Sequence, residues 1–133
     1  MKSRSKFNVS NKNKEWNGIR FDSMMELQYY RDVLLPGVAD GSIVSYELQK
    51  KYVLQPKCKY HGKTVREIYY LADFYVVYSD GTSAVIDVKG MPTEGAKLKR
   101  KMFMYQYPDE NLIWVTYKKN LGGWVDCSAK KDK

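Results

Sequence analysis

The stretch from Tyr69 to Gly90, YYLADFYVVYSDGTSAVIDVKG, constrains the fold most, because it encodes two apolar strands and the turn that joins them. Each strand carries one aspartate among hydrophobic neighbours, Asp73 in the first and Asp87 in the second. Successive side chains of a strand point to opposite faces, so Asp87 and Lys89 share a face. The Asp-x-Lys spacing therefore directs a carboxylate and an ammonium to the same place.

The length of the turn decides whether the two aspartates meet. A two-residue Asp80-Gly81 loop, the commonest connection for such a dipeptide, places Asp73 opposite Val88 and the two carboxylates on opposite faces. A three-residue loop over 79–81 places Asp73 directly opposite Asp87, with the glycine in a left-handed conformation. We predict the second register, which brings the two Cβ atoms within about 4.5–5.5 Å. Two half-desolvated carboxylates that close repel by several kcal/mol unless a cation separates them, so a divalent metal ion is expected there.

Both aspartates also have an ordinary structural interpretation. A lone aspartate in a strand is usually exposed to solvent, and an Asp-x-Lys pair is usually a same-face ion pair worth under about 1 kcal/mol. The pairing of Asp73 with Asp87 in one hairpin, and the apolar neighbours of both, favour the functional interpretation.

Composition bounds the class of protein. A chain of 133 residues with 44% hydrophobic content supports one domain with a core. No apolar run approaches the length of a membrane span, and the N-terminus does not resemble a secretion signal, so we expect a cytoplasmic protein without membrane contact. Two distant cysteines and a single histidine, His61, support neither a disulfide framework nor a zinc site. The net charge of +8, with lysines among many tyrosines, favours a nucleic acid partner.

The order of expected elements is helix, three strands, helix, strand. We expect a basic mobile arm over 1–18, one domain over 19–126 and a basic tail over 127–133. Within the domain the pattern predicts helices over 24–35 and 94–106, the first ended by Pro36-Gly37 and the second capped by Thr93. It also predicts strands over 42–55 and 111–117, with a further edge strand at 122–125. A parallel pairing of 111–117 with the Asp87 strand would make the second helix a crossover connection.

The two helices supply further candidate residues. Ser23 and Glu26 form an S-x-x-E capping box, so the default interpretation of Glu26 is that it caps the helix. Glu26 is also expected at the rim of the helix's apolar stripe, Leu27, Tyr30 and Leu34, from where its carboxylate could reach the aspartates. On the second helix we expect Leu98, Met102 and Tyr105 to be buried, flanked by lysines. Those lysines, Lys97, Lys99 and Lys101, form either a solvated face or a basic surface near the carboxylates.

These motifs together resemble the PD-(D/E)XK nuclease superfamily, with its restriction-endonuclease-like core, an α-β-β-β-α-β arrangement in which helices flank a mixed sheet. The segments FDSMMELQYY, LADF, IDVKG and AKLKRKMF look more narrowly like a family of small phage-encoded proteins, formerly a domain of unknown function, that includes proteins taken to be endonucleases. The similarity spans about residues 18–115. Ala72 stands where the superfamily's name has proline.

The resemblance implies a metal-dependent reaction on DNA. Asp73 and Asp87, with the Val88 carbonyl, would hold Mg²⁺ or Mn²⁺, and Glu26 would bind a second metal or a metal-bound water. Lys89 would orient or deprotonate the attacking water and stabilise the developing charge. A lysine of the second helix, Lys101 or Lys99, would contact the phosphate, and the two are not distinguished.

The resulting expectation is a Mg²⁺-dependent DNA endonuclease that acts on branched DNA in phage recombination or replication, in the style of Holliday-junction resolvases. Its location would be the host cytoplasm, and cutting two strands would imply a homodimer. A sequence-specific restriction or nicking nuclease is the alternative enzyme. A non-catalytic DNA-binding module on the same fold is the alternative from another class.

Overall fold

The computed structural model describes residues 14–127, and these divide into two compact units that meet between Ile43 and Val44 in the sequence. The expected arm and tail fall mostly outside the described residues. The structure is mixed α/β with a five-stranded mixed sheet, which confirms the predicted α/β class and its mixed sheet. No helix in the described part is both long and apolar enough to cross a membrane.

The N-terminal unit begins with a short hairpin of β1 (Glu15–Trp16) and β2 (Ile19–Arg20). Its turn is Asn17-Gly18, with positive φ at both residues (56° and 82°), as a two-residue hairpin turn requires. Phe21 follows and packs its ring against Tyr30, with 5.2 Å between centroids. The last residues of the expected arm are therefore part of a folded hairpin.

A continuous helical segment follows the hairpin, in three parts: α2 (Met24–Tyr29), the π-helical η1 (Tyr30–Leu34) and α3 (Leu35–Ala39). The predicted end of the helix at Pro36 is wrong, because the helix continues to Ala39. Proline has no N–H to donate to the preceding turn. The π-helical turn just before it shifts the hydrogen-bond pattern, and Pro36 then lies at the start of α3, where the missing N–H costs little.

Gly37 is buried in this segment and has a packing role. A Cβ at this position would lie 2.6 Å from Cδ1 and 2.9 Å from Cγ1 of Ile43. The absence of a side chain therefore lets the Ile43 side chain lie directly against the helix backbone. The glycine that was expected to end the helix instead permits a close contact within it.

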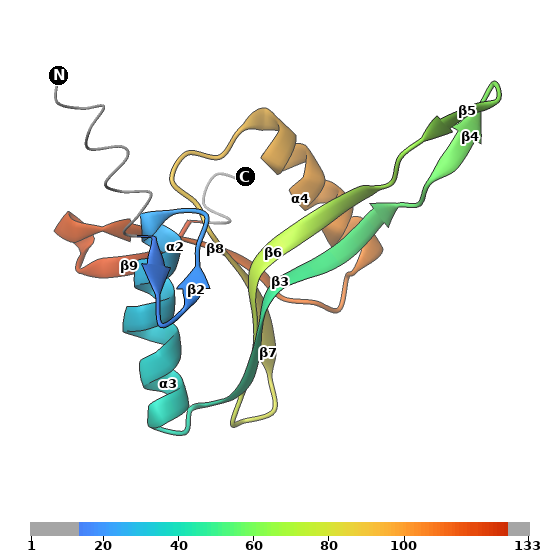
Figure 1. Cartoon of the computed structure of the whole chain (residues 1–133). Coiled ribbons are helices and arrows are strands. Elements are labelled where there is room, and N and C mark those ends of the chain that lie inside the picture. The colour runs from blue at the N-terminus through green and yellow to red at the C-terminus, as the bar shows by residue number, and fades with distance from the viewer. Residues whose placement is uncertain (1–13, 128–133) are drawn as a thin grey trace, which may run out of the picture. The chain divides into compact units, whose positions relative to one another are not determined.

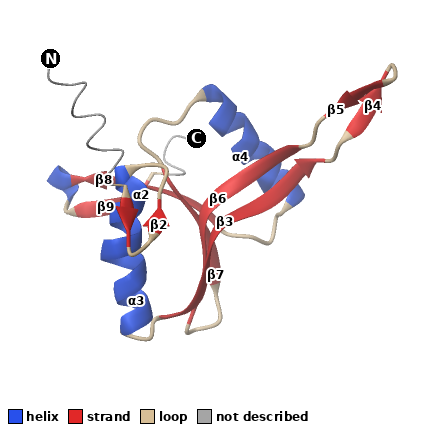
Figure 2. Cartoon of the chain, viewed as in Figure 1, coloured by secondary structure: helices blue, strands red, loops and turns tan. Residues whose placement is uncertain are grey.

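The sheet has the strand order β3-β6-β7-β8-β9 (Figures 1 and 2). β6 and β7 are antiparallel, β7 and β8 parallel, and β8 and β9 antiparallel. The parallel pairing of the Asp87 strand with the strand after the second helix, and the added edge strand, are thus confirmed. The strands are β3 (Ile43–Gln55), β6 (Ile68–Tyr78), β7 (Ser83–Val88), β8 (Leu112–Lys118) and β9 (Gly123–Asp126).

The β6–β7 hairpin has the predicted three-residue turn. The Tyr78 N–H donates to the Thr82 carbonyl at 2.8 Å, and Gly81 has a φ of 92°. The pairs Val77↔Ser83 through Phe74↔Ile86 follow the same register. The next step of this register brings Asp73 opposite Asp87, so the choice of the longer loop is confirmed.

The second helix, α4 (Glu94–Gln106), has the predicted bounds, and Thr93 Oγ1 caps it by accepting a hydrogen bond from Ala96 N at 3.0 Å. Its predicted buried stripe is wrong at two of three positions, because Leu98 is 60% exposed and Tyr105 is 85% exposed, whereas Met102 is partly buried against the core. The packed side is instead centred on Phe103, which is fully buried. The Phe103 ring contacts the rings of Tyr52, Tyr70 and Tyr107.

Two hydrogen bonds fix α4 to β3. Gln106 Nε2 donates to the Leu54 carbonyl at 2.9 Å, and the Tyr107 hydroxyl donates to the Val53 carbonyl at 2.8 Å. The core between the helix and the sheet joins the α4 side chain Phe103 to buried residues of four strands: Tyr52, Leu54, Tyr70, Ala72, Val85, Leu112 and Trp114. Aromatic packing around one helical residue therefore positions α4 over the sheet.

The basic segment around Gly62 forms a second hairpin, of β4 (Cys58–Tyr60) and β5 (Lys63–Val65). It continues from the end of β3 and returns into β6, and Figure 1 shows it extending beyond α4 and the ends of those two strands. The basic residues of this segment therefore lie along a projecting hairpin.

Candidate functional site

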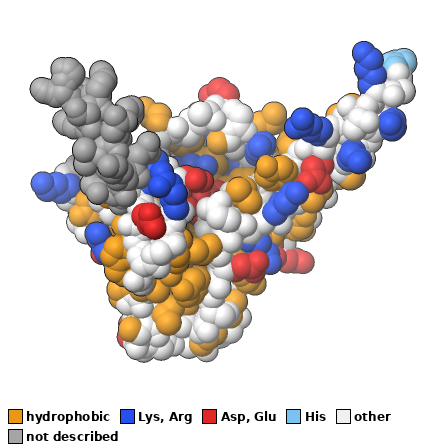
Figure 3. Space-filling model, in the orientation of Figure 1, with side chains coloured by type: hydrophobic (Ala, Val, Ile, Leu, Met, Phe, Trp, Pro, Cys, Tyr) orange, Lys and Arg blue, Asp and Glu red, His pale blue; other side chains and the backbone are white. Residues whose placement is uncertain are grey.

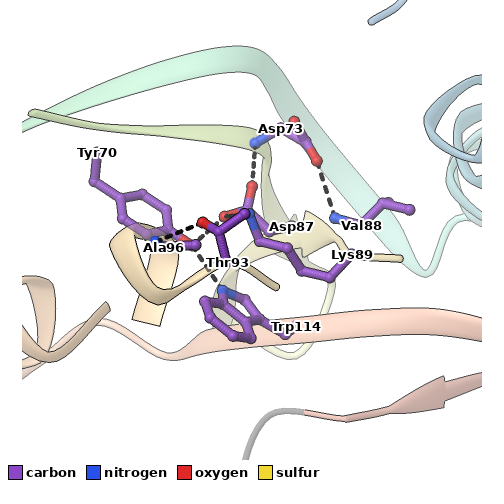
Figure 4. Close-up of polar contacts among 8 residues, drawn as sticks. All are labelled: Tyr70, Asp73, Asp87, Val88, Lys89, Thr93, Ala96 and Trp114. Atoms are coloured by element: carbon purple, nitrogen blue, oxygen red, sulfur yellow. Dashed lines mark hydrogen bonds and ion pairs between the residues drawn. The ribbon is translucent and has the colours of Figure 1, made fainter. Parts of the chain in front are cut away.

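Asp73 and Asp87 are joined by reciprocal contacts through the backbone. The Asp73 N–H donates to Asp87 Oδ1 at 2.8 Å, and the Val88 N–H donates to Asp73 Oδ2 at 2.9 Å (Figure 4). The two carboxylates thus act as acceptors where a regular ladder would use backbone carbonyls. Asp87 is 2% exposed. The strands therefore fold two acidic groups into one hydrogen-bonded arrangement.

The second oxygen of Asp87 is held by Tyr70. The Tyr70 hydroxyl donates to Asp87 Oδ2 and accepts a 2.8 Å hydrogen bond from Trp114 Nε1 (Figure 4). All three side chains are buried, and they come from β6, β7 and β8. A chain of donors that starts at an indole therefore ends on the Asp87 carboxylate and fixes its orientation.

Lys89 is the cation nearest to this arrangement in the sequence. Its Nζ lies 4.0 Å from Asp87 Oδ2, and its side chain is about one quarter exposed. The ammonium also lies 5.2 Å from the centre of the Trp114 ring. The predicted convergence of Asp87 and Lys89 on one place is therefore present in the structure.

Arg100 brings a second cation to the same tryptophan. Its guanidinium carbon lies 4.9 Å from the centre of the Trp114 ring, a cation–π distance. Arg100 is on the side of α4 that faces the sheet, whereas Lys97, Lys99 and Lys101 are exposed. Lys97 pairs with Glu94, and the Lys99 ammonium lies 5.7 Å from the Tyr69 ring.

Burial and charge act together on Tyr70. Burial raises the pKa of the Tyr70 hydroxyl, and the neighbouring Asp87 carboxylate raises it further, both by coulombic repulsion of a phenolate and by the hydrogen bond. A hydroxyl that keeps its proton stays a donor. Donors from Tyr70 and from the Asp73 backbone therefore compensate the cost of burying the Asp87 charge.

The donor set fits a hard divalent cation in its chemistry. Carboxylate and carbonyl oxygens are the ligands that Mg²⁺ prefers, and Mg²⁺ retains several waters, so few protein ligands suffice. The N–H and C=O of a strand residue point toward the same neighbouring strand. Since the Val88 N–H reaches Asp73, regular strand geometry directs the Val88 carbonyl to that side as well. Within residues 14–127, no group of three or more acidic, histidine or cysteine side chains is gathered as a larger metal cluster.

Glu26 lies in α2 of the N-terminal unit and is 4% exposed, so it is buried instead of lying at a rim. Its backbone N–H donates to Ser23 Oγ at 3.0 Å, which confirms the capping role expected for Ser23. The apolar stripe of Leu27, Tyr30 and Leu34 is buried, as predicted.

The sequence interpretation missed Tyr70, Trp114 and Arg100. Strict alternation along β6 puts Tyr70 on the face opposite Asp73, so its contact with Asp87 was not expected. The regular pairing of β6 with β7 ends at Phe74↔Ile86, before Tyr70 is reached. Arg100 was missed because the wrong buried face was assigned to α4. The helical face formed by Ala96, Arg100, Phe103 and Tyr107, at spacings of three and four residues, includes it.

The fold and the site define a mixed α/β protein whose sheet carries a hydrogen-bonded aspartate pair beside a lysine. The chain belongs to the family described as a protein of unknown function, DUF1064, whose model matches residues 4–122. No curated protein matches the chain.

Proposed function

We propose that this protein is a metal-dependent DNA endonuclease with a restriction-endonuclease-like core of the PD-(D/E)XK type. One observation carries the proposal. The carboxylates of Asp73 and Asp87, on adjacent strands, are positioned by reciprocal hydrogen bonds from the backbone of the other strand, and Lys89 Nζ lies 4.0 Å from Asp87 Oδ2. Two acids and a lysine at this spacing provide the groups that hydrolysis of a phosphodiester needs. The net charge of +8 suits a polyanionic substrate.

Each residue has a distinct role in the proposal. Asp73, Asp87 and the Val88 carbonyl would hold Mg²⁺ or Mn²⁺, which when bound activates water and neutralises charge on the phosphate. Tyr70 keeps the Asp87 carboxylate oriented through its hydroxyl. Lys89 would exchange a proton with the attacking water or stabilise the charge that develops on the phosphate oxygens.

Further assignments extend the proposal. The exposed lysines of α4, Lys97, Lys99 and Lys101, are proposed to contact phosphates next to the scissile bond. Because backbone contacts position DNA without reading its sequence, we favour a substrate recognised by shape, such as a junction or branch. Two symmetric cuts would require a homodimer. The proposed location is the cytoplasm of the host cell.

The test is cleavage of a DNA panel with Mg²⁺ or Mn²⁺ present: linear duplex, single strand, flap and four-way junction. We expect cleavage of at least one branched substrate, and its loss in Asp73→Asn and Lys89→Ala with DNA binding retained. Asp80→Asn, in the exposed β6–β7 turn, is the matched control and should cut normally. Absence of cleavage on every substrate with either metal would contradict the proposal.

The same panel distinguishes the other functions. A non-catalytic DNA-binding module would bind these substrates and cut none. A sequence-specific nuclease would cut linear duplex at fixed sites irrespective of branching.

A further inference from the structure

The β4–β5 hairpin is a projection that has no core of its own. All six residues of its two strands are exposed, including Tyr60 at 68%. An isolated two-stranded hairpin is only marginally stable in water. Its shape is set locally by a two-residue His61-Gly62 turn with φ of 49° and 79°, and by the Tyr60 ring, which lies edge-on to His61 at 4.3 Å.

The charge of the hairpin has one sign. Residues 56–66 include four cations, Lys57, Lys59, Lys63 and Arg66, and no acid. Figure 3 shows blue side chains along this projection and the histidine at its tip. None of the four cations forms an ion pair with any residue in the described range. Glu67, the next acid along the chain, is already paired with Lys51.

The dimensions suit duplex DNA. The major groove of B-form DNA is wide enough to admit a two-stranded ribbon. Lys63 and Asp73 are ten residues apart, a distance of at most about 33 Å along an extended chain. One turn of the double helix is about 34–36 Å. Any contact that Lys63 makes with the duplex would thus fall within about one helical turn of a phosphate held at the aspartate pair.

We propose that the β4–β5 hairpin inserts into the major groove of duplex DNA within about one helical turn of the phosphate held by Asp73 and Asp87. Lys59 and Lys63 would contact the phosphates that border the groove. The position relative to a cut rests on the proposed function, whereas the insertion itself does not require cleavage.

The test compares two variants with the same change of charge. Lys59→Gln/Lys63→Gln alters the hairpin, and Lys118→Gln/Lys119→Gln alters exposed lysines at the end of β8. Each is bound to guanine-containing duplex DNA, without divalent metal, and probed with dimethyl sulfate, which methylates guanine N7 in the major groove. We expect wild type and the β8 variant to protect a patch of guanines, and the hairpin variant to lose that protection.

Salt dependence gives a second readout. Removing one lysine–phosphate interaction should reduce the slope of log K against log salt by about 0.9, so the slope of the hairpin variant should be smaller by about 1.8. A further variant with residues 57–66 replaced by a short glycine turn removes the whole projection and should behave in the same way. This hairpin-deletion variant also tests the inference if the double variant folds poorly.

The outcomes separate this inference from the proposed function. Guanine protection that depends on the hairpin supports the inference even when no metal produces cleavage. Cleavage by wild type, together with unchanged protection and slope in both hairpin variants, would overturn the inference and leave the nuclease proposal standing. Absence of any guanine protection by wild type would also overturn it.

Discussion

The backbone N–H of Asp73 donates to Oδ1 of Asp87 at 2.8 Å, although the two residues are 14 positions apart in the chain. A side-chain oxygen takes the place of the backbone acceptor in a regular ladder. The contact from the Val88 N–H to Asp73 Oδ2 makes the arrangement reciprocal. Because these bonds need an acceptor oxygen and not a charge, substitution by asparagine separates the geometry of the site from its charge.

The first prediction concerns metal binding. With Mn²⁺ at about one hundred times its dissociation constant, the free energy of unfolding of wild type should rise by about 2.7 kcal/mol over its value in EDTA. Asp87→Asn keeps an acceptor for Asp73 N but removes a charge, so the rise should largely disappear. Urea unfolding with and without Mn²⁺ measures it.

The comparison uses only the shift that metal causes in each variant, so any change in stability from the substitution itself cancels. Asp80→Asn should retain the full shift, since Asp80 is an exposed turn residue that bonds Thr82. An undiminished Mn²⁺ effect in Asp87→Asn would show that the ion binds elsewhere.

The second prediction concerns Tyr70. In Tyr70→Phe the Asp87 carboxylate loses a donor, and Trp114 Nε1 loses its acceptor in a buried place. Leaving buried polar groups unsatisfied costs about 1–3 kcal/mol, so the variant should be less stable by about that amount at pH 7. A matched Tyr105→Phe variant, at an 85% exposed position, should change stability little.

The loss from Tyr70→Phe should depend on pH in a definite direction. The pKa of Tyr70 is raised in the folded state, so between the unfolded pKa of about 10 and the folded value the unfolded chain loses a proton that the folded chain keeps. The stability that Tyr70 contributes is therefore complete below about pH 10 and falls above it, by about 1.4 kcal/mol per pH unit. Urea midpoints of wild type and variant should converge from pH 9 to 11; a constant difference would contradict this.

The local signals in the sequence were sufficient for most of the fold. Turn chemistry left two β6–β7 registers open, because Gly81 can take a positive φ in either loop, and the expected pairing of the two aspartates selected the three-residue loop that is observed. Thr93 and the flanking breaks gave the bounds of α4. These features depend on neighbours in the chain, so a single sequence contains them.

Features that depend on tertiary packing could not be predicted in this way. Pro36 continues a helix because a π-helical turn precedes it, and nothing in the local pattern signals that turn. The packed side of α4 is decided by aromatic partners on β3 and β6, not by which stripe is more apolar. The Tyr70–Asp87 bond likewise joins residues that strict strand alternation separates.

The third prediction contrasts two glycines. Gly37→Ala places a Cβ 2.6 Å from Ile43 Cδ1, so it should destabilise the protein by about 1–3 kcal/mol. Gly95→Ala, near the start of α4, meets only Thr93 Oγ1 at 3.9 Å and should stabilise by about 0.5–1 kcal/mol through helix propensity. Thermal melts of both variants measure the difference. Equal effects would show that Ile43 moves aside freely, and Gly37→Ala/Ile43→Val should recover part of the loss.

The last prediction concerns the cation that α4 presents to the sheet. Arg100→Ala removes a guanidinium 4.9 Å from the Trp114 ring together with a partly buried stem, so it should cost about 1–2 kcal/mol. Arg100→Lys keeps the charge but loses planar stacking and should be intermediate. Lys101→Ala, the exposed neighbour, should change stability by no more than about 0.5 kcal/mol.

A double-mutant cycle assigns the effect to the stacked pair. If the stacking is responsible, Arg100→Ala and Trp114→Leu, which removes the aromatic face, should show a coupling energy of about 0.5–1 kcal/mol in urea unfolding. The same cycle between Lys101→Ala and Trp114→Leu should give a coupling near zero. Additive effects for Arg100 and Trp114 would instead mean that Arg100 stabilises the protein through contacts other than the face of the indole ring.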